Sequence, residues 1–506
     1  AGVALSPGVA KIEVTEPLLE GDGEWTLLAV PSPLLYDGRG ANLPWLQEVP
    51  DPVTKIAWQS WVEISNATAQ KLGVEFGDVV SVETPFGRFE APAVPRGALR
   101  DDVIAVGIGQ GHTVGRYASR GGVTTAGEAR GVNVIASLPS AADEAGGRAW
   151  LSTKAKLSRT GRSEQVAILQ KFDNQRERQL AEAVPVSALA TAAAAQGHDT
   201  AHAAGAAPAA GAEHAAGGDA HGAGDTAHGE GGGHHEMLVP FDAKLDAHPD
   251  LPYRWGMTVD LDRCNGCSAC VVACYVENNV PVVGEEQVIR GRVMSWIRIE
   301  RYVGPGVVDY VPGRPPIRDH GALGDVDVRH LPVMCQQCGA APCEPVCPVI
   351  ATSHSDEGLN GMIYNRCIGT RYCANNCPYK VRRFNFYDYA AEESRFPYPM
   401  ELGLNPDVTV RGQGVMEKCT FCVQRIALGR QTAKNLGRAI ADGEVTTACA
   451  QSCPTDAIVF GNLRDETSRA VQLGKDPARG YHALHVLNTR PSVTYLAKVT
   501  RGPVEA

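Results

Sequence analysis

The sequence predicts a multidomain α+β protein with three successive parts. Three observations lead to this prediction. The chain has 506 residues, which is enough for two to four domains. A stretch rich in Ala, Gly and His lies near its middle, and all 15 cysteines lie between Cys264 and Cys453. We therefore expect a β-rich module at 1–185, a linker at 186–249 and a cysteine-rich domain at 250–506.

Bulk composition indicates a folded protein and disfavours several classes of partner. Hydrophobic residues make up 44% of the chain, an ordinary globular value. The net charge of −10 is mild for this length, and no RNA- or DNA-binding motif is present. No long apolar run occurs, so no membrane-spanning segment is expected. Because the sequence starts with Ala1 and shows no signal peptide, we expect a processed or internal fragment.

The first part alternates short apolar runs with turn residues. A helix is predicted over Asn66–Leu72, with Asn66 as its N-cap and Gly73 at its C′ position. The segment Pro85-Phe86-Gly87 is typical of the turn of a β-hairpin. Strands are predicted at 61–65, 78–82, 88–91 and 103–106.

The linker at 186–249 has low complexity, most clearly up to residue 236. It lacks the large apolar side chains that offset chain entropy, so we expect a flexible, solvated segment. Seven of the 14 histidines lie between residues 186 and 236, and metal binding by these histidines is the alternative.

The cysteines fall into four groups with short, regular spacings. An odd number of cysteines packed into one region argues against a disulfide framework. The groups are Cys264-x2-Cys267-x2-Cys270-x3-Cys274; Cys335-x2-Cys338-x4-Cys343-x3-Cys347-Pro348; Cys367-x5-Cys373-x3-Cys377-Pro378; and Cys419-x2-Cys422 followed, after 26 residues, by Cys449-x3-Cys453-Pro454.

These spacings are typical of proteins that bind four-iron, four-sulfide clusters. Closely spaced cysteines in one tight loop reach three corners of a small cube, whereas the fourth cysteine ligates a neighbouring cluster. The proline that follows turns the chain away and removes an N–H donor. The four groups therefore predict four clusters that share loops.

Zinc is the main alternative, because Cys-x2-Cys pairs are common in zinc ribbons. Zinc takes four ligands, however, and has no use for a further cysteine that is followed by proline. Four such groups therefore favour iron–sulfur clusters over zinc. A redox-active dithiol is an even weaker explanation than zinc.

The third group departs from the pattern at one position. Regular spacing predicts cysteine at position 370, where the sequence has Thr370. Threonine is a poor iron ligand, so we expect one empty corner and a cluster of the three-iron, four-sulfide type. A fourth iron held by water, hydroxide or another non-cysteine ligand is the alternative.

The cysteine groups resemble those of the four-cluster iron–sulfur subunits of complex molybdopterin oxidoreductases, such as polysulfide, dimethyl sulfoxide and nitrate reductases. The resemblance covers roughly residues 250–500 and implies a tandem bacterial-ferredoxin-like domain. It is carried by Cys264-Asn-Gly-Cys-Ser-Ala-Cys270, Ala273-Cys-Tyr-Val-Glu-Asn-Asn279, Cys377-Pro-Tyr-Lys-Val-Arg-Arg383 and Glu417-Lys-Cys-Thr-Phe-Cys422.

This resemblance implies that the first group pairs with the fourth and the second with the third. Spacing alone indicates only that ligands are shared, and no residue is predicted to be catalytic. The implied ligand sets are Cys264, Cys267, Cys270 and Cys453 for one [4Fe-4S] cluster; Cys274, Cys419, Cys422 and Cys449 for a second; Cys335, Cys338, Cys343 and Cys377 for a third; and Cys347, Cys367 and Cys373 for one [3Fe-4S] cluster.

The N-terminal part resembles the last domain of molybdopterin oxidoreductases, a six-stranded β-barrel that closes over the pterin dinucleotide. Gly107-Ile-Gly-Gln-Gly-His112 lies where that family has a loop near the cofactor. Without a surrounding βαβ unit, a simple Gly-rich turn is favoured over phosphate binding. The resemblance is carried by Asp51-Pro-Val-Thr-Lys-Ile-Ala-Trp58, Trp61-Val-Glu-Ile, Leu72-Gly and Gly77-Asp78-Val.

Both modules on one chain resemble the large iron–sulfur subunit of bacterial alternative complex III, which oxidises quinol. The resemblance implies an electron-transfer subunit without substrate chemistry, with no molybdenum cofactor in this chain and with further domains upstream. The implied partners are a polytopic quinol-binding membrane subunit, haem c subunits and a terminal oxidase, on the periplasmic face of the bacterial cytoplasmic membrane. The alternative is the electron-transfer part of a molybdenum-dependent reductase of the polysulfide or dimethyl sulfoxide type.

Cationic side chains surround the third and fourth groups and are expected to stabilise anionic clusters. An ordinary solvated basic face is the alternative. The segment 487–496, which also resembles the fused family, is expected to serve packing or subunit contact. The cations are Arg366, Arg371, Lys380, Arg382, Arg383, Lys418 and Arg425.

Overall fold

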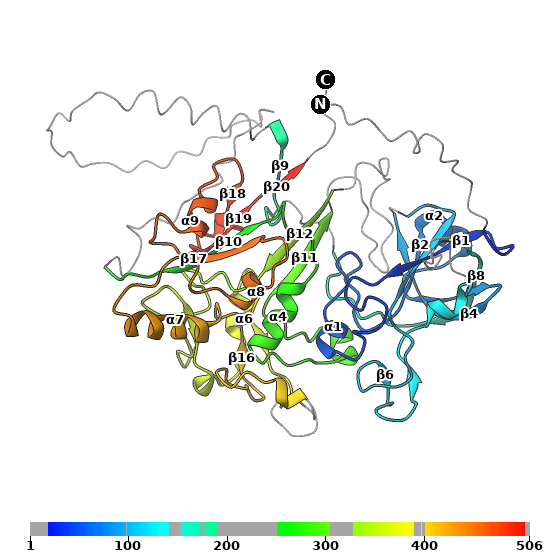
Figure 1. Cartoon of the computed structure of the whole chain (residues 1–506), viewed down its shortest axis with the longest axis horizontal. Coiled ribbons are helices and arrows are strands. Elements are labelled where there is room, and N and C mark those ends of the chain that lie inside the picture. Colours follow the sequence, from blue (N-terminus) through cyan, green and yellow to red (C-terminus); the bar gives the residue numbers. More distant parts are fainter. Residues whose placement is uncertain are drawn as a thin grey trace, which may run out of the picture.

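The computed structural model describes residues 19–140, 151–189, 250–303, 327–388 and 396–500, apart from 98, 152, 173–174, 176–177, 188 and 397–399. Figure 1 shows the N-terminal module, coloured blue to cyan, beside the cysteine-rich domain, coloured green to red. The linker predicted at 186–249 lies almost entirely outside the described residues.

Six strands of the N-terminal module pair into a closed ring in the order β1-β5-β2-β4-β3-β8, and β8 returns to β1. Inward-facing aliphatic side chains such as Leu27, Ile64 and Ile104 fill its centre and are fully buried. The strands are β1 (Trp25–Pro31), β2 (Val62–Ser65), β3 (Asp78–Thr84), β4 (Gly87–Arg96), β5 (Val103–Ile108) and β8 (Thr153–Ser163).

The strands and the hairpin predicted in this module are confirmed, and one capping assignment is wrong. The helix α2 spans Asn66–Leu72 as predicted, and Gly73 follows it with a left-handed φ of 62°. Its N-cap is Ser65 rather than Asn66, because the Ser65 hydroxyl accepts a hydrogen bond from the Thr68 N–H at 3.0 Å. Smaller elements are α1 (Pro44–Glu48), β6 (Ser119–Arg120), β7 (Glu128–Ala129), η2 (Val134–Ser137) and β9 (Ala183–Pro185).

The cysteine-rich domain is built around a four-stranded sheet of order β17-β10-β19-β18. Strand β10 (Trp255–Asp260) lies at its centre, antiparallel to β17 (Ile458–Asn462) and parallel to β19 (Val493–Leu496). Packing is thus confirmed for the predicted segment 487–496, since Val493 and Tyr495 are buried in the core.

Around this sheet, short helices and two-stranded ribbons carry the cysteine loops (Figure 1). The helices are α4 (Ala269–Glu277), α5 (Glu285–Ile289), η5 (Tyr364–Arg366), α6 (Tyr372–Asn376), η6 (Met400–Gly403), α7 (Val423–Asn435), α8 (Ala448–Gln451), α9 (Arg469–Gly474) and η7 (His485–Leu487). The further strands are β11 (Arg298–Val303), β12 (Val328–Val333), β13 (Thr352–His354), β14 (Asn360–Met362), β15 (Arg383–Phe384), β16 (Met416–Glu417), β18 (Gly480–Tyr481) and β20 (Lys498–Thr500).

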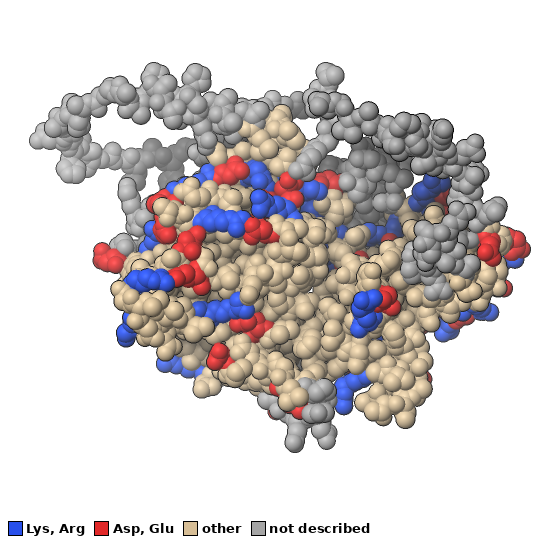
Figure 2. All heavy atoms as spheres, viewed as in Figure 1, with Lys and Arg blue, Asp and Glu red and all other residues tan. Residues whose placement is uncertain are grey.

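Acidic and basic side chains are interspersed over the face that Figure 2 shows. A mixed surface of this kind fits the mild net charge of −10. Within the described ranges, none of the helices combines the length and apolarity that crossing a bilayer requires.

The two modules share a core and several buried polar contacts. Val49 belongs to the apolar cluster of the cysteine-rich domain. The Glu48 carboxylate, at the end of α1, accepts hydrogen bonds from the N–H groups of Val283 and Gly284, both at 2.8 Å, and from the Tyr275 hydroxyl at 3.2 Å. Strand β9 also pairs in parallel with β20, near the end of the described chain. The modules therefore pack as one unit.

A buried ion pair positions the loop that leads into the fourth cysteine group. The side chains of Arg411 and Glu417 are 0% and 1% exposed, and their charged groups lie 2.7 Å apart. The Glu417 carboxylate also accepts hydrogen bonds from the Trp296 indole N–H at 2.9 Å and the Asn385 amide at 2.6 Å. Glu417 lies two residues before Cys419, so these contacts fix where that loop begins.

The burial of Glu48 predicts that the free energy of unfolding depends on pH. Burial raises its pKa from 4.5 to about 7, against the lowering effect of the groups that hydrogen-bond to it. The folded protein thus holds this proton more tightly than the unfolded chain does. The free energy of unfolding should therefore fall as the pH rises from about 4.5 to about 7, by up to about 3 kcal/mol.

Urea unfolding between pH 5 and pH 7.5 checks this expectation. The Glu48→Gln variant, which cannot ionise, should show a flatter pH dependence than the wild type. Glu75, exposed on the same module, provides the matched control Glu75→Gln. Equal slopes for the wild type and Glu48→Gln would contradict the assignment.

Replacing Glu417 with Ala should destabilise the cysteine-rich domain by about 3–5 kcal/mol, because Arg411 would remain as a buried charge without its partner. The fall in the urea midpoint measures this loss. The exposed pair of Arg438 and Glu444 provides the control, since Glu444→Ala should change the midpoint little. An equal effect of the two substitutions would disprove the anchoring role of Glu417.

Candidate iron–sulfur centres

The first and third cysteine loops share one backbone conformation. In the first, Gly266 and Ser268 flank Cys267 with φ values of 76° and 63°. In the third, Gly369 and Arg371 flank Thr370 with φ values of 73° and 61°. Thr370 therefore occupies the position that Cys267 has in the first loop, and its side chain is exposed.

The three Cys-Pro segments also fold alike. The third residue after each cysteine, Ile350, Lys380 or Asp456, has a left-handed φ of 50° to 56°. This turn directs the next N–H back to the sulfur. The Ala351 N–H donates to Cys347 Sγ and the Ala457 N–H to Cys453 Sγ, both at 3.2 Å, and the N–H of Val381 lowers the pKa of Cys377 against the effect of burial. The proline at the exit thus forms part of a turn that supplies a hydrogen bond to sulfur.

The first set of thiols gathers from two ends of the domain. Burial, followed by the charges of neighbouring thiols, raises the pKa of Cys270 well above its usual value. The neighbours in the same set are Cys264, Cys267 and Cys453. Burial raises the pKa of Cys264 to about 11, and both Cys453 and Cys267 contribute. Cys453, almost 190 residues away in the sequence, thus lies beside the first loop.

The second set combines Cys274 of α4 with three cysteines of the fourth group. Burial, followed by the charges of Cys419, Cys422 and Cys449, raises the pKa of Cys274 well above its usual value. One side-chain amide bridges two of these sulfurs, because Asn278 Nδ2 lies 3.5 Å from Cys274 Sγ and 3.8 Å from Cys422 Sγ.

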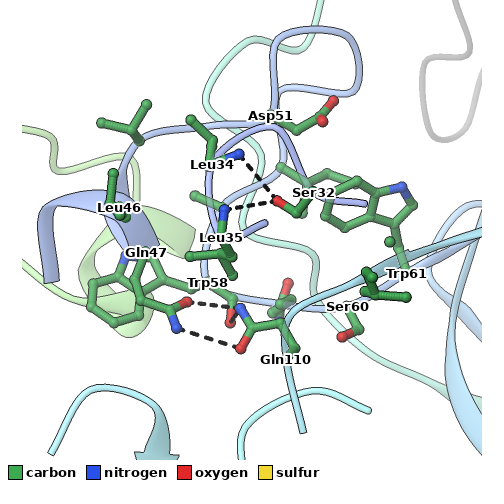
Figure 3. A pocket seen from close by; sticks show the side chains of 16 residues that line it. Ser32, Leu34, Leu35, Leu46, Gln47, Asp51, Trp58, Ser60, Trp61 and Gln110 are labelled. Atoms are coloured by element: carbon green, nitrogen blue, oxygen red, sulfur yellow. Dashed lines mark hydrogen bonds between the residues drawn. The ribbon is translucent and has the colours of Figure 1, made fainter. Parts of the chain in front are cut away.

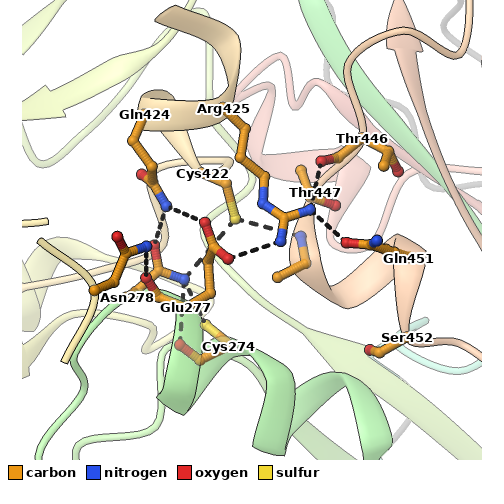
Figure 4. Close-up of polar contacts among 12 residues, drawn as sticks. Cys274, Glu277, Asn278, Cys422, Gln424, Arg425, Thr446, Thr447, Gln451 and Ser452 are labelled. Atoms are coloured by element: carbon orange, nitrogen blue, oxygen red, sulfur yellow. Dashed lines mark hydrogen bonds and ion pairs between the residues drawn. The ribbon is translucent and has the colours of Figure 1, made fainter. Parts of the chain in front are cut away.

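Figure 4 shows the polar network that holds Asn278 in this orientation. The amide of Gln424 lies 3.2 Å from Asn278 Oδ1 and 2.9 Å from Glu277 Oε1. Arg425 pairs with Glu277 at 2.7 Å and also donates to the Gln451 side chain at 2.6 Å. The network joins α4 to α7 and α8, so it fixes both halves of the second set.

The third set surrounds a small cavity. Cys335, Cys338, Cys343 and Cys377 all line it, together with Arg382. Burial, and then the neighbouring thiols, raises the pKa of Cys338. The Arg382 guanidinium donates to Cys343 Sγ at 3.2 Å and to Asn360 Oδ1 at 2.8 Å.

The fourth set contains three cysteines and is less buried than the second and third sets. Cys373 is buried, whereas Cys347 and Cys367 are half-buried. Burial opposes ionisation of Cys347, but backbone N–H groups outweigh it and lower its pKa, and the Arg382 charge acts in the same direction. Arg382 also interacts with Cys373, so this guanidinium lies between the third and fourth sets.

The four sets follow one another in space. Cys270 of the first set interacts electrostatically with Cys449 of the second. Cys419 of the second set interacts in the same way with Cys335 of the third. Arg382 interacts with thiols of both the third set and the fourth. The order is thus first, second, third, fourth, with an electrostatic interaction at each junction.

The seven cations predicted around the clusters divide into two classes. Arg382 contacts thiols directly, and Lys418 is fully buried with its ammonium donating to the Cys419 carbonyl at 2.9 Å. Arg425 joins the network beside Cys422.

The other four cations have no hydrogen bond to a cysteine sulfur among the described contacts. They are Arg366, Arg371, Lys380 and Arg383, and the first three are exposed. Asn278, which the sequence analysis did not single out, lay within the motif 273–279.

The environment of the thiol sets suits the binding of a group that contains metal cations. Burial raises the pKa of Cys270, Cys274 and Cys419 well above the usual value, so these buried thiols need a cationic partner to ionise. Coordinated iron deprotonates a thiol outright, and N–H donors already point at several of the sulfurs. In the described part of the chain, no trio of Cys, His, Asp or Glu side chains converges as the ligands of a single metal ion would.

A separate cavity lies in the N-terminal module (Figure 3). Trp58 and Trp61 line it, and the side-chain amides of Gln47 and Gln110 hydrogen-bond to each other at 2.7 Å. The segment 107–112 passes along this cavity at the end of β5. Gly109 and Gly111 have φ values of 111° and 94° there, so the segment forms a tight turn that requires glycine.

Two family models match the chain. A "Molydopterin dinucleotide binding domain" covers residues 47–149, which include most of the cavity lining just described. A "4Fe-4S dicluster domain" covers residues 366–457. One solved structure, acetylene hydratase from Pelobacter acetylenicus, is 20% identical with a TM-score of 0.20 over 29% of this chain. The chain covers about a fifth of that enzyme, 21%.

Several curated proteins are similar to this chain. The iron–sulfur cluster-binding subunit of menaquinone reductase from Nitratidesulfovibrio vulgaris is 37% identical over 259 residues, which are 50% of this chain and 92% of that subunit. An iron–sulfur protein from Halobacterium salinarum, named as a subunit of dimethyl sulfoxide reductase, is 37% identical over 42% of this chain and 68% of the relative. The Hdr-like menaquinol oxidoreductase iron–sulfur subunit 1 from Archaeoglobus fulgidus is 34% identical over 42% of this chain and 73% of the relative. The chain therefore belongs to the family of iron–sulfur subunits of molybdopterin-type oxidoreductase complexes.

Proposed function

We propose that this chain carries electrons one at a time along its four cysteine sets. The single observation that carries this proposal is the continuous succession of the sets, with an electrostatic interaction at each junction. Iron–sulfur clusters supply one-electron transfer when they are bound. The cysteines hold them, and the N–H donors and Arg382 stabilise the negative charge on their sulfurs.

The ligand sets are those that the family resemblance implies, and the grouping of the thiols in the first, second and third sets supports them. The first, second and third sets each offer four cysteines, which suits a [4Fe-4S] cluster. The fourth set offers Cys347, Cys367 and Cys373, while Thr370 stands at the position of the missing ligand. The matching backbone of the first and third loops supports this equivalence, and we propose a [3Fe-4S] cluster there.

We further propose that the chain serves a membrane-bound complex that oxidises quinol, of the alternative complex III type. Two observations support this. A menaquinone reductase subunit and a menaquinol oxidoreductase subunit are among its relatives. The module matching the pterin-binding family also packs directly against the cluster domain of the same chain. Its partners would be a polytopic quinol-binding subunit, haem c subunits and an oxidase, at the periplasmic face of the cytoplasmic membrane.

A molybdenum-dependent reductase is the second candidate. Relatives named as subunits of dimethyl sulfoxide and selenate reductases favour it. Metal analysis and electron input of the intact complex separate the two candidates. Molybdenum in the complex together with reduction of an oxyanion or sulfoxide would favour the reductase, whereas reduction of the clusters by menaquinol without molybdenum would favour the quinol-oxidising complex.

The cluster assignment predicts about 15 iron atoms per chain, from three four-iron clusters and one three-iron cluster. Low-temperature electron paramagnetic resonance should show a three-iron signal in the oxidised protein and coupled signals after reduction. The Thr370→Cys variant restores the fourth ligand, so it should lose the three-iron signal and hold about 16 iron atoms.

Thr370→Ser is the matched control, because it keeps a hydroxyl and should keep the three-iron signal. A chain that holds its full iron but never shows a three-iron signal would disprove the role of Thr370. A chain without iron would disprove the proposed function altogether.

A further inference from the structure

A tight turn of the N-terminal module faces the cysteine-rich domain at Asp51–Lys55. One carboxylate oxygen, Asp51 Oδ1, accepts hydrogen bonds from the N–H groups of Val53 and Thr54 at 2.9 and 2.7 Å, and from the Thr54 hydroxyl at 3.0 Å. The Lys55 N–H donates to the Asp51 carbonyl at 3.1 Å. Lys55 itself has a left-handed φ of 63°, which is unfavourable for a side chain of this size. The turn thus holds Lys55 in one strained orientation.

The side chain of Lys55 is buried without a partner. The residue is 1% exposed, and its ammonium forms no hydrogen bond with any described residue. Burial, and then the nearby charge of Arg301, lowers its pKa to about 8, so the amine is still mainly charged at neutral pH. A buried ammonium that makes no hydrogen bond is costly. The charges of Asp51, Cys264 and Glu300 act in the opposite direction to burial and favour its charged form.

Lys55 lies near the first cysteine loop. It lines a cavity between the two modules together with Ser268 and Val271, which belong to that loop and to α4. Lys55 also acts electrostatically on Cys264: burial raises the pKa of this thiol, and the ammonium lowers it. The positive charge is therefore close to the first thiol set.

A second buried nitrogen atom without a hydrogen-bond partner among the described residues lies against the same loop. The His330 ring packs on Gly266 so closely that a Cβ atom there would meet His330 Nδ1 at 2.7 Å. His330 Nδ1 is buried and has no hydrogen-bond partner in the described part of the chain. Two buried nitrogen atoms without hydrogen-bond partners in the described part of the chain thus lie near the loop that carries Cys264 and Cys267, where the first cluster would be held.

We propose that Lys55 is the counter-charge of the cluster held by Cys264, Cys267, Cys270 and Cys453, and that its ammonium raises the reduction potential of that cluster. The added electron makes the cluster more negative, so a fixed cation nearby stabilises the reduced form. The fused N-terminal module thereby sets the potential at one end of the electron path. This inference rests on the proposed function, because it requires a cluster in the first set.

The test is an electron paramagnetic resonance redox titration of the full chain in its complex. Lys55→Met removes the charge but keeps the length and apolar stem of the side chain, so the variant should fold. The equilibrium constant for reduction of the first cluster should fall about tenfold, which is about 59 mV for a one-electron couple. Lys55→Arg should keep the potential of the wild type. Cys453→Ser identifies the signal of the first cluster.

Lys71→Met is the matched control, because Lys71 lies exposed on the same module and pairs with Glu24. It should leave all four potentials unchanged. An unchanged first cluster in Lys55→Met, with full iron content, would overturn the inference while leaving the proposed function intact. An equal shift of all clusters would also overturn it, since that would indicate a general structural effect. A wild-type chain without cluster signals would instead disprove the proposed function.

Discussion

The exchange of cysteines between distant loops is the constraint on which the rest of this structure depends. Cys453 lies with the first loop, and Cys274 lies with the fourth group, so each end of the domain completes a set begun at the other. Burial raises the pKa of most of these thiols, which means that the folded domain is organised around groups that ionise only beside a cation. The short helices and two-stranded ribbons position these loops, and a single four-stranded sheet provides the apolar core between them.

Hydrogen bonds to sulfur give the four sets different environments. Backbone N–H groups serve Cys347 and Cys453 through the same Cys-Pro turn. Asn278 bridges two sulfurs of the second set, and Arg382 reaches sulfur in the third. Donors of this kind stabilise added electrons and so tune the potential of each centre separately. The fourth set differs most, since it has three cysteines, two of which are only half-buried.

The N-terminal module packs against the clusters' domain through polar contacts that are buried rather than peripheral. Glu48 accepts backbone hydrogen bonds from the segment that follows α4, and Lys55 lies against the first loop. These contacts come from the turn and the short helix between β1 and β2, outside the ring of strands. A module that resembles a cofactor-binding domain thus contributes side chains to a neighbouring electron-transfer site.

The sequence alone determined the local features whose cause is local. The hairpin at β3 and β4, helix α2 and the four cysteine groups could all be predicted, because turn residues, capping patterns and ligand spacing act over a few residues. The assignment of the N-cap to Asn66 was wrong by one residue, since only the coordinates show that Ser65 accepts the hydrogen bond. The ligand sets required a family resemblance, because spacing does not say which distant loop supplies the fourth cysteine.

Tertiary structure alone decided which side chains surround the sets. Lys55, His330 and Asn278 lie near the cysteine loops only because segments far apart in the chain pack together, and no sequence period marks such contacts. For the same reason, the sequence could predict a cationic environment but could not separate Arg382, which contacts sulfur, from the exposed Arg366 and Arg371. Spacing thus specified the ligands, whereas burial and long-range packing specified the charges that act on them.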